Sequence, residues 1–178
     1  MRAFVAISIP EEIKNRISEI QNQIPKFNGK LTEKENLHLT LKFLGEISQD
    51  LLENVKSALS RIKFPTLSLL INKLGTFNYQ NNPRIVWLHI NGADELQRKV
   101  DSALSEFFRP EERFMSHLTI ARVKYVDNTK KFSEEIEKIK FPNLSFEPGS
   151  FELIESCLTK QGSVYKLIET YRTERLNK

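Results

Sequence analysis

The chain contains very little cysteine and very little histidine. Cys157 is the single cysteine among 178 residues, and histidine occurs three times. One cysteine excludes an intrachain disulfide, which favours a reducing, cytoplasmic location. The opening residues, MRAFVAISIP, hold an apolar run too short to span a membrane and lack a small-residue cleavage site. They therefore predict a first strand, with neither a signal peptide nor a membrane partner.

A strong excess of one charge is also missing. The chain has 27 Lys and Arg against 23 Asp and Glu, a net charge of +4. The small positive net charge mildly favours an anionic partner. It does not indicate a basic nucleic-acid arm, because the lysines are dispersed among glutamates. The 39% hydrophobic and 28% charged residues are typical of a globular domain. The length suits one domain, or two tightly joined lobes, over residues 1–178, and we expect a monomer.

Hydrophobic periodicity predicts alternating strands and helices. The predicted helices cover 10–23, 48–62, 93–108 and 131–139, with Ser48 as an N-cap. The Asn28-Gly29 pair predicts a loop, and the polar residues 78–83 predict a hairpin turn. The predicted strands are 3–9, 37–43, 67–77, 84–90, 116–123, 144–147, 151–158 and 164–173.

The order of these elements indicates a weak internal duplication. The first half has the order strand, helix, strand, helix and hairpin. The second half repeats most of it, with the order helix, strand, helix and hairpin. Interleaved strands and helices also suit a parallel sheet, but the short connections favour antiparallel pairing. We therefore predict an α+β fold with two similar lobes of mainly antiparallel sheet, helices outside, and a central groove between the lobes.

One short motif occurs once in each half of the chain. HLTL stands at 38–41 and HLTI at 117–120. Because side chains alternate along a strand, His38 and Thr40 share one face, opposite the leucines that belong in the core. His117 and Thr119 share a face in the same way. A single copy would suit the solvent side of an amphipathic strand, but two copies point to a site.

Two His-Thr pairs suit displacement at phosphorus. Histidine titrates near pH 6.5, so one ring can accept a proton while the other donates one. A base and an acid on opposite sides of phosphorus serve an incoming and a leaving oxygen, while each threonine hydroxyl binds a phosphoryl oxygen. This chemistry needs no metal and no cofactor. A zinc hydrolase is the alternative, and it would require the third histidine, His89, beside both motifs.

The paired motifs resemble those of the two-histidine phosphoesterase superfamily. The stretches RAFVAISIP, LKFLGEI, GTF…PRIVWLHI and FMSHLTIARV make the chain similar to LigT-like RNA 2′,3′-cyclic phosphodiesterases, also called 2′–5′ RNA ligase-like. The resemblance implies a bilobed fold and an enzyme that opens 2′,3′-cyclic phosphates at RNA or nucleotide ends to 2′-phosphates. Some relatives also join tRNA halves, while others on this fold are non-catalytic nucleotide or RNA-end binding modules.

The resemblance also assigns roles to residues. It implies His38 as general acid, His117 as general base, and Thr40 and Thr119 as phosphate ligands. Phe43 and Arg122, each five residues after its histidine, match positions that contact a base or phosphate.

Strict alternation, by contrast, would place Phe43 and Arg122 on the core face. The core suits Phe43, whereas Arg122 predicts a strand end or a bulge that frees its guanidinium. We expect His89 to pack on a sheet face. Three further cations, Lys42 on the His38 face, Arg84 and Lys124, are either contacts for a polynucleotide or part of a solvated surface.

Overall fold

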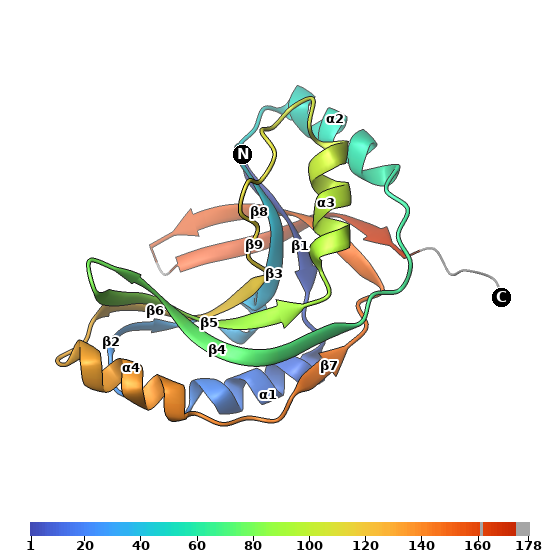
Figure 1. The fold of residues 1–178 in the computed structure, drawn as a ribbon. Helices are drawn as coiled ribbons and strands as arrows, with labels where there is room; N and C mark the ends of the chain where they lie inside the picture. The colour runs from blue at the N-terminus through green and yellow to red at the C-terminus, as the bar shows by residue number, and fades with distance from the viewer. Residues whose placement is uncertain (161, 174–178) are drawn as a thin grey trace.

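The computed structural model describes residues 1–160 and 162–173, which form two antiparallel sheets flanked by four α-helices (Figure 1). The first sheet has the order β3-β1-β8-β9 and the second has the order β2-β6-β5-β4-β7. The first comprises β1 (Arg2–Ser8), β3 (His38–Glu46), β8 (Ser150–Thr159) and β9 (Gly162–Arg172). The second comprises β2 (Asn28–Leu31), β4 (Leu69–Tyr79), β5 (Asn82–Asn91), β6 (His117–Tyr125) and β7 (Leu144–Phe146). The predicted α+β class with antiparallel pairing is confirmed.

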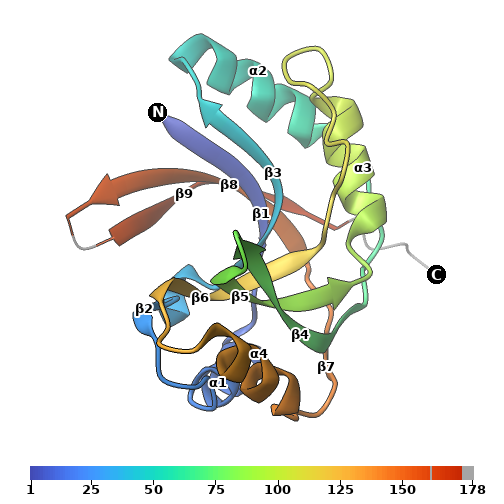
Figure 2. The ribbon, with the colours of Figure 1, turned by 60° about the vertical axis from the view of Figure 1, so that its left-hand side comes forward.

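The helices cover the outer faces of the two sheets. Helices α1 (Glu11–Gln21) and α4 (Thr129–Lys138) pack on the second sheet, while α2 (Gln49–Ser60) and α3 (Asp94–Ala103) pack on the first (Figure 2). Alternating apolar residues of the strands face these helices and form the core. None of the helices in the described ranges is both long and apolar enough to cross a membrane.

The two sheets do not correspond to the two halves of the chain. The hairpin β4–β5 follows the first motif strand, β3, yet it pairs with the second motif strand, β6. The last hairpin, β8–β9, returns to pair with β1 beside β3. The duplication therefore has a counterpart in space, since each sheet holds one motif strand, but each half of the chain contributes its hairpin to the opposite sheet.

Several local predictions are confirmed. Ser48 caps α2, because its hydroxyl accepts a hydrogen bond from the backbone N–H of Leu51 at 3.2 Å. The hairpin turn lies at Gln80 and Asn81, whose positive φ angles of 48° and 62° suit a tight two-residue connection.

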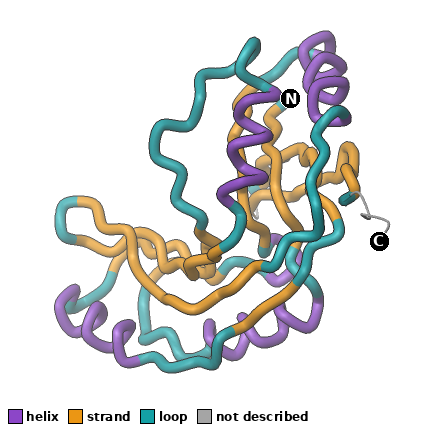
Figure 3. Tube along the Cα trace, turned by 45° about the vertical axis from the view of Figure 1, so that its right-hand side comes forward, coloured by secondary structure: helices purple, strands orange, loops and turns teal. Residues whose placement is uncertain are grey.

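Two predicted boundaries are wrong. The stretch predicted as a loop at Asn28-Gly29 belongs to β2, which pairs with β6. Gly29 permits this pairing, because a Cβ there would lie 2.2 Å from the carbonyl oxygen of Arg122. Helix α3 ends at Ala103 and not near residue 108, since Leu104 leaves the helical conformation. A long loop, residues 104–116, then leads into β6 (Figure 3).

Candidate active site

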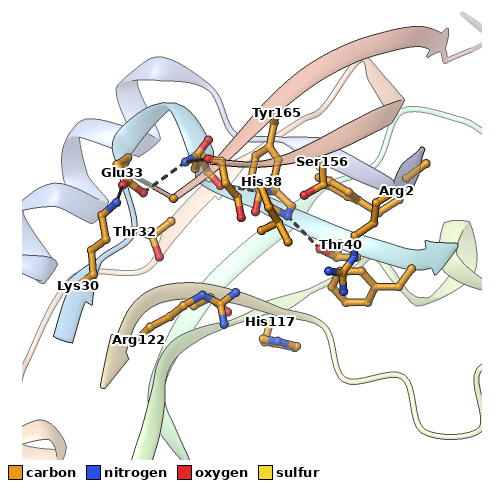
Figure 4. A pocket seen from close by; sticks show the side chains of 18 of the residues that line it. Arg2, Lys30, Thr32, Glu33, His38, Thr40, His117, Arg122, Ser156 and Tyr165 are labelled. Atoms are coloured by element: carbon orange, nitrogen blue, oxygen red, sulfur yellow. Dashed lines mark hydrogen bonds and ion pairs between the residues drawn. The ribbon is translucent and has the colours of Figure 1, made fainter. Parts of the chain in front are cut away.

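A cavity of about 440 Å³ lies between the two sheets and gathers the six residues to which the family resemblance assigned roles. Figure 4 labels His38, Thr40, His117 and Arg122 among them. Strand β3 supplies one half of them and β6 the other, and the two strands have the same pattern of burial along their nine residues. The six are His38, Thr40, Phe43, His117, Thr119 and Arg122. The duplicated motif thus builds two facing walls of one site.

The two histidines are held in the same way. The Nδ1 atom of His38 lies 2.7 Å from the carbonyl oxygen of Asn36, and Nδ1 of His117 lies 2.7 Å from that of Met115. Because a carbonyl oxygen can only accept, Nδ1–H is the donor in both rings, and Nε2 is left as the acceptor in the neutral form. The Nε2 atom of His38 lies 3.0 Å from the hydroxyl of Thr40. Both rings are therefore fixed with Nε2 available for proton transfer.

Aromatic rings pack against both histidines. The ring centroids of Phe4 and Tyr165 lie 4.8 and 5.1 Å from that of His38. The ring of Phe77 lies 5.1 Å from His117 in an edge-to-face arrangement. These contacts restrict rotation of the imidazoles and help to keep their orientation.

The electrostatic setting of His38 favours its neutral form. Burial is the largest of the effects that together lower the pKa of His38 to about 4. The hydrogen bond to the Asn36 carbonyl raises this pKa, while the positive charges of Arg122 and Lys14 help to lower it. In the free protein at neutral pH, His38 therefore carries no charge.

A β-bulge in each motif strand brings the fifth residue after the histidine into the cavity. In β3 both Leu41 and Lys42 are buried, and the register with β1 shifts between Val5 and Ala6. The extra residue reverses the alternation, so Phe43 leaves the core face and lines the cavity, with 71% of its surface exposed. The core position predicted for Phe43 is therefore wrong.

The second motif strand repeats this bulge. Ile120 and Ala121 are both buried, and the register of β6 with β5 shifts between Val86 and Trp87. Arg122 consequently points into the cavity (Figure 4). Of the two alternatives predicted at Arg122, a strand end or a bulge, the bulge is confirmed, and it lies just before Arg122 in a strand that continues to Tyr125.

The other charged candidates lie outside the cavity lining. Lys42 is buried and forms an ion pair with Asp101, so the expectation that it shares the His38 face is wrong. Its position at the bulge explains the error, because the bulge turns Lys42 toward the helices. Arg84 donates a hydrogen bond to the carbonyl oxygen of Lys124 at 2.6 Å.

The third histidine lies on the sheet as expected. His89 is the direct cross-strand partner of His117 but does not line the cavity. Within residues 1–160 and 162–173, no three His, Cys, Asp or Glu side chains gather as a metal site would require.

Sequence reasoning missed several lining residues. Arg2, Asn36 and Tyr165 belong to the cavity wall, and Asn36 also orients His38. Arg2 precedes the strand predicted at 3–9, and nothing in the sequence pairs that strand with β3. Tyr165 comes from β9, which reaches the site through long-range pairing.

Comparisons with known proteins agree with this architecture. The family model described as "LigT like Phosphoesterase" matches residues 7–87 and 90–165. An RNA 2′,3′-cyclic phosphodiesterase of Methanocaldococcus jannaschii is 37% identical over 175 residues, covering 96% of this chain and 100% of the relative. Another with the same name, from Thermotoga maritima, is 35% identical, covering 94% of this chain and 93% of the relative.

Solved structures share the fold. TT0787 of Thermus thermophilus superposes with a TM-score of 0.81 at 24% identity, covering 97% of both chains. Escherichia coli LigT complexed with 3′-AMP superposes with a TM-score of 0.78 at 24% identity, covering 98% of both chains. The two sheets, the shared groove and the sequence match define a two-histidine phosphoesterase. The chain belongs to the LigT-like phosphoesterase family.

Proposed function

We propose that this chain hydrolyses 2′,3′-cyclic phosphate ends of RNA or nucleotides to 2′-phosphates, with His38 and His117 as the acid–base pair. The observation that carries the proposal is the placement of two His-Thr pairs on facing strands of one cavity. The name shared by the relatives, RNA 2′,3′-cyclic phosphodiesterase, supports the substrate class.

The proposed reaction is an in-line displacement by water. His117 accepts a proton from the water as its oxygen bonds to phosphorus, while His38 donates a proton to the 3′ oxygen as the P–O3′ bond breaks. The product carries a 2′-phosphate and a free 3′-hydroxyl. Thr40 and Thr119 donate hydrogen bonds to the phosphoryl oxygens, and Arg122 balances the charge that builds there.

The acid role of His38 depends on the substrate. The pKa of about 4 in the free protein would leave His38 without a proton to donate. A bound cyclic phosphate brings a negative charge between His38 and Arg122 and so favours the charged imidazole. We infer that His38 takes up its proton together with the substrate, which makes the free and bound forms differ in their pH dependence.

The same site admits a second nucleophile. A 5′-hydroxyl in place of water would attack the same phosphorus and produce a 2′–5′ phosphodiester with a free 3′-hydroxyl. tRNA halves that end in a cyclic phosphate and a 5′-hydroxyl are substrates of this kind. Phe43, exposed on the cavity wall, supplies a ring for base stacking in either reaction.

The test is turnover of a nucleoside 2′,3′-cyclic phosphate in excess EDTA. We expect hydrolysis by the wild type, and a loss of roughly 10²–10⁴-fold in turnover for His38→Gln or His117→Gln. The double variant should be far less than multiplicatively worse, because the two residues act as a unit.

His89→Gln is the matched control, since His89 neighbours His117 but lies outside the cavity lining. A folded His89→Gln protein as inactive as the other two would contradict the assignment of the site. Tight binding of the cyclic phosphate without any turnover would instead identify a non-catalytic nucleotide-binding module.

A further inference from the structure

Arg2 lines the same cavity as the two histidines. Along β1 the residues alternate: Ala3, Val5 and Ile7 join the core under the helices, whereas Phe4 and Ala6 pack on the opposite face. Arg2 shares the face of Phe4 and Ala6, and its side chain points into the cavity (Figure 4).

The pairing of β1 with β3 determines the order of the residues along this side of the cavity, which we call the cavity wall. Ala6 pairs with Thr40, Phe4 pairs with Phe43, and Arg2 pairs with Glu46. Arg2 and Ala6 are four residues apart, about 13 Å along an extended strand. Along the backbone, the cavity wall therefore runs from the phosphate-binding Thr40, past Phe43, to Arg2, whose side chain extends over the cavity (Figure 4).

Among the described residues, no carboxylate forms an ion pair with Arg2. In the part of the chain that the structure describes, the Arg2 side chain has no ion pair and no hydrogen bond. Its cross-strand partner, Glu46, lies 3.7 Å from the amino group of Met1. Lys30, another cation of the cavity, forms an ion pair with Glu33. Arg2 is therefore available to bind an anion that enters the cavity.

The geometry points to the nature of that anion. We propose that Arg2 binds the phosphate on the 5′ side of the terminal nucleotide, so that the preferred substrate carries a 5′-phosphate or a preceding nucleotide. This proposal rests on the proposed function, in which the cyclic phosphate lies between the two His-Thr pairs.

The order of groups in a nucleotide matches the order of residues on the wall. The ribose and base separate the 2′,3′-cyclic phosphate from the 5′-phosphate, as Phe43 separates Thr40 from Arg2. A guanidinium presents paired N–H donors that fit two oxygens of a phosphate. Arg2 is thus a substrate-binding residue that selects nucleotide or RNA ends over nucleosides lacking a 5′-phosphate.

Two substrates that differ in one group test the proposal. One is a nucleoside 2′,3′-cyclic phosphate, and the other is the same compound with a 5′-phosphate. At low salt we expect the wild type to show a kcat/KM at least about tenfold higher for the second, the scale of a hydrogen bond to a charged group. Arg2→Gln should lower kcat/KM for the second substrate at least about tenfold more than for the first and so remove the preference, while Arg2→Lys should retain part of it.

The control is Arg98→Gln, which removes an exposed arginine of α3 outside the cavity lining. It should keep the full preference. Equal loss on both substrates in Arg2→Gln, or no loss on either, would overturn the proposal. A wild type that turned over neither substrate would contradict the proposed function itself, so the two failures are distinguishable. Thermal melts of Arg2→Gln should match the wild type, because the residue is exposed.

Discussion

Breaking the buried ion pair between Lys42 and Asp101 should destabilise the protein strongly. The side chains of Lys42 and Asp101 are 3% and 12% exposed. The Lys42 amino group also donates to the carbonyl oxygen of Arg109 at 2.9 Å, and Asp101 accepts from the N–H of Glu111 at 2.6 Å. The pair therefore ties motif strand β3 to α3 and to the loop that leads to His117.

Lys42→Met leaves the carboxylate of Asp101 buried without its cation. Breaking a buried ion pair costs about 3–5 kcal/mol. We expect the lower end, about 3 kcal/mol, because Asp101 keeps the Glu111 N–H and some contact with solvent. For a chain of this size each kcal/mol shifts the melting temperature by about 2–4 °C, so the predicted drop is about 6–12 °C.

Thermal melts at neutral pH measure this drop. Lys56→Met is the control, since Lys56 forms ion pairs at the surface of α2 that should be worth less than about 1 kcal/mol. Lys42→Met combined with Asp101→Leu should recover part of the loss, because no uncompensated charge remains. A Lys42→Met protein that melts no lower than Lys56→Met, or a double variant less stable than the single one, would refute the reasoning.

The pH dependence of this effect has a definite sign. Burial raises the pKa of Asp101, but the hydrogen bonds from Lys42 and from the Glu111 N–H outweigh it, so the pKa is lowered from 3.8. The stability that ionised Asp101 provides is present above that value and is lost as the pH falls through the lower folded pKa. The gap between wild type and Lys42→Met should therefore narrow below about pH 4.

Four further outcomes are expected. The pKa of His38 is lowered to about 4, so the unfolded chain takes up its proton first. Wild-type stability should then fall from pH 6.5 to 4, and His38→Gln should flatten that slope in urea titrations. If substrate raises this pKa, the limb that requires protonated His38 should lie at higher pH in kcat than in kcat/KM. Phe43→Ala should weaken binding of a non-hydrolysable nucleotide by about 1–3 kcal/mol, and Phe43→Trp should not, as measured by calorimetry. Binding of a longer RNA end with two or three backbone contacts should show a slope of log affinity against log salt of about −1.5 to −2, steeper than that of a mononucleotide.

The motif strands could be predicted from the sequence because their pattern is local. Alternation alone placed His38 and Thr40 opposite Leu39, and the structure confirms that arrangement. The chain's resemblance to the LigT-like family is confirmed as well.

The bulges were only half predictable. A bulge depends on how a strand pairs with its neighbour, which is β1 for β3 and β5 for β6. The motif residues alone do not determine that pairing. Arg122 gave a signal, because an unpaired guanidinium is costly to bury. Phe43 gave no such signal, since a phenyl ring suits the core equally well. The same bulge in β3 also reversed the face that we expected for Lys42.

Nothing in the local sequence indicated that each half of the chain would contribute its hairpin to the sheet that holds the other half's motif strand. Sequence neighbours favour pairing with one another, whereas β4–β5 pairs with β6 and β8–β9 pairs with β1. The pairing of β8–β9 with β1 brings Tyr165 to the cavity, and the pairing of β1 with β3 brings Arg2 there, which is why both were missed.

The most direct test of the proposed chemistry is the identity of the product. Wild-type protein should convert a nucleoside 2′,3′-cyclic phosphate, in excess EDTA, into the nucleoside 2′-phosphate, as read by phosphorus NMR. This result is predicted because the 3′ oxygen is the leaving group that receives the proton of His38. A 3′-phosphate product would contradict the assignment of the leaving group, and activity that vanishes in EDTA and returns with zinc would contradict acid–base catalysis by the two histidines alone.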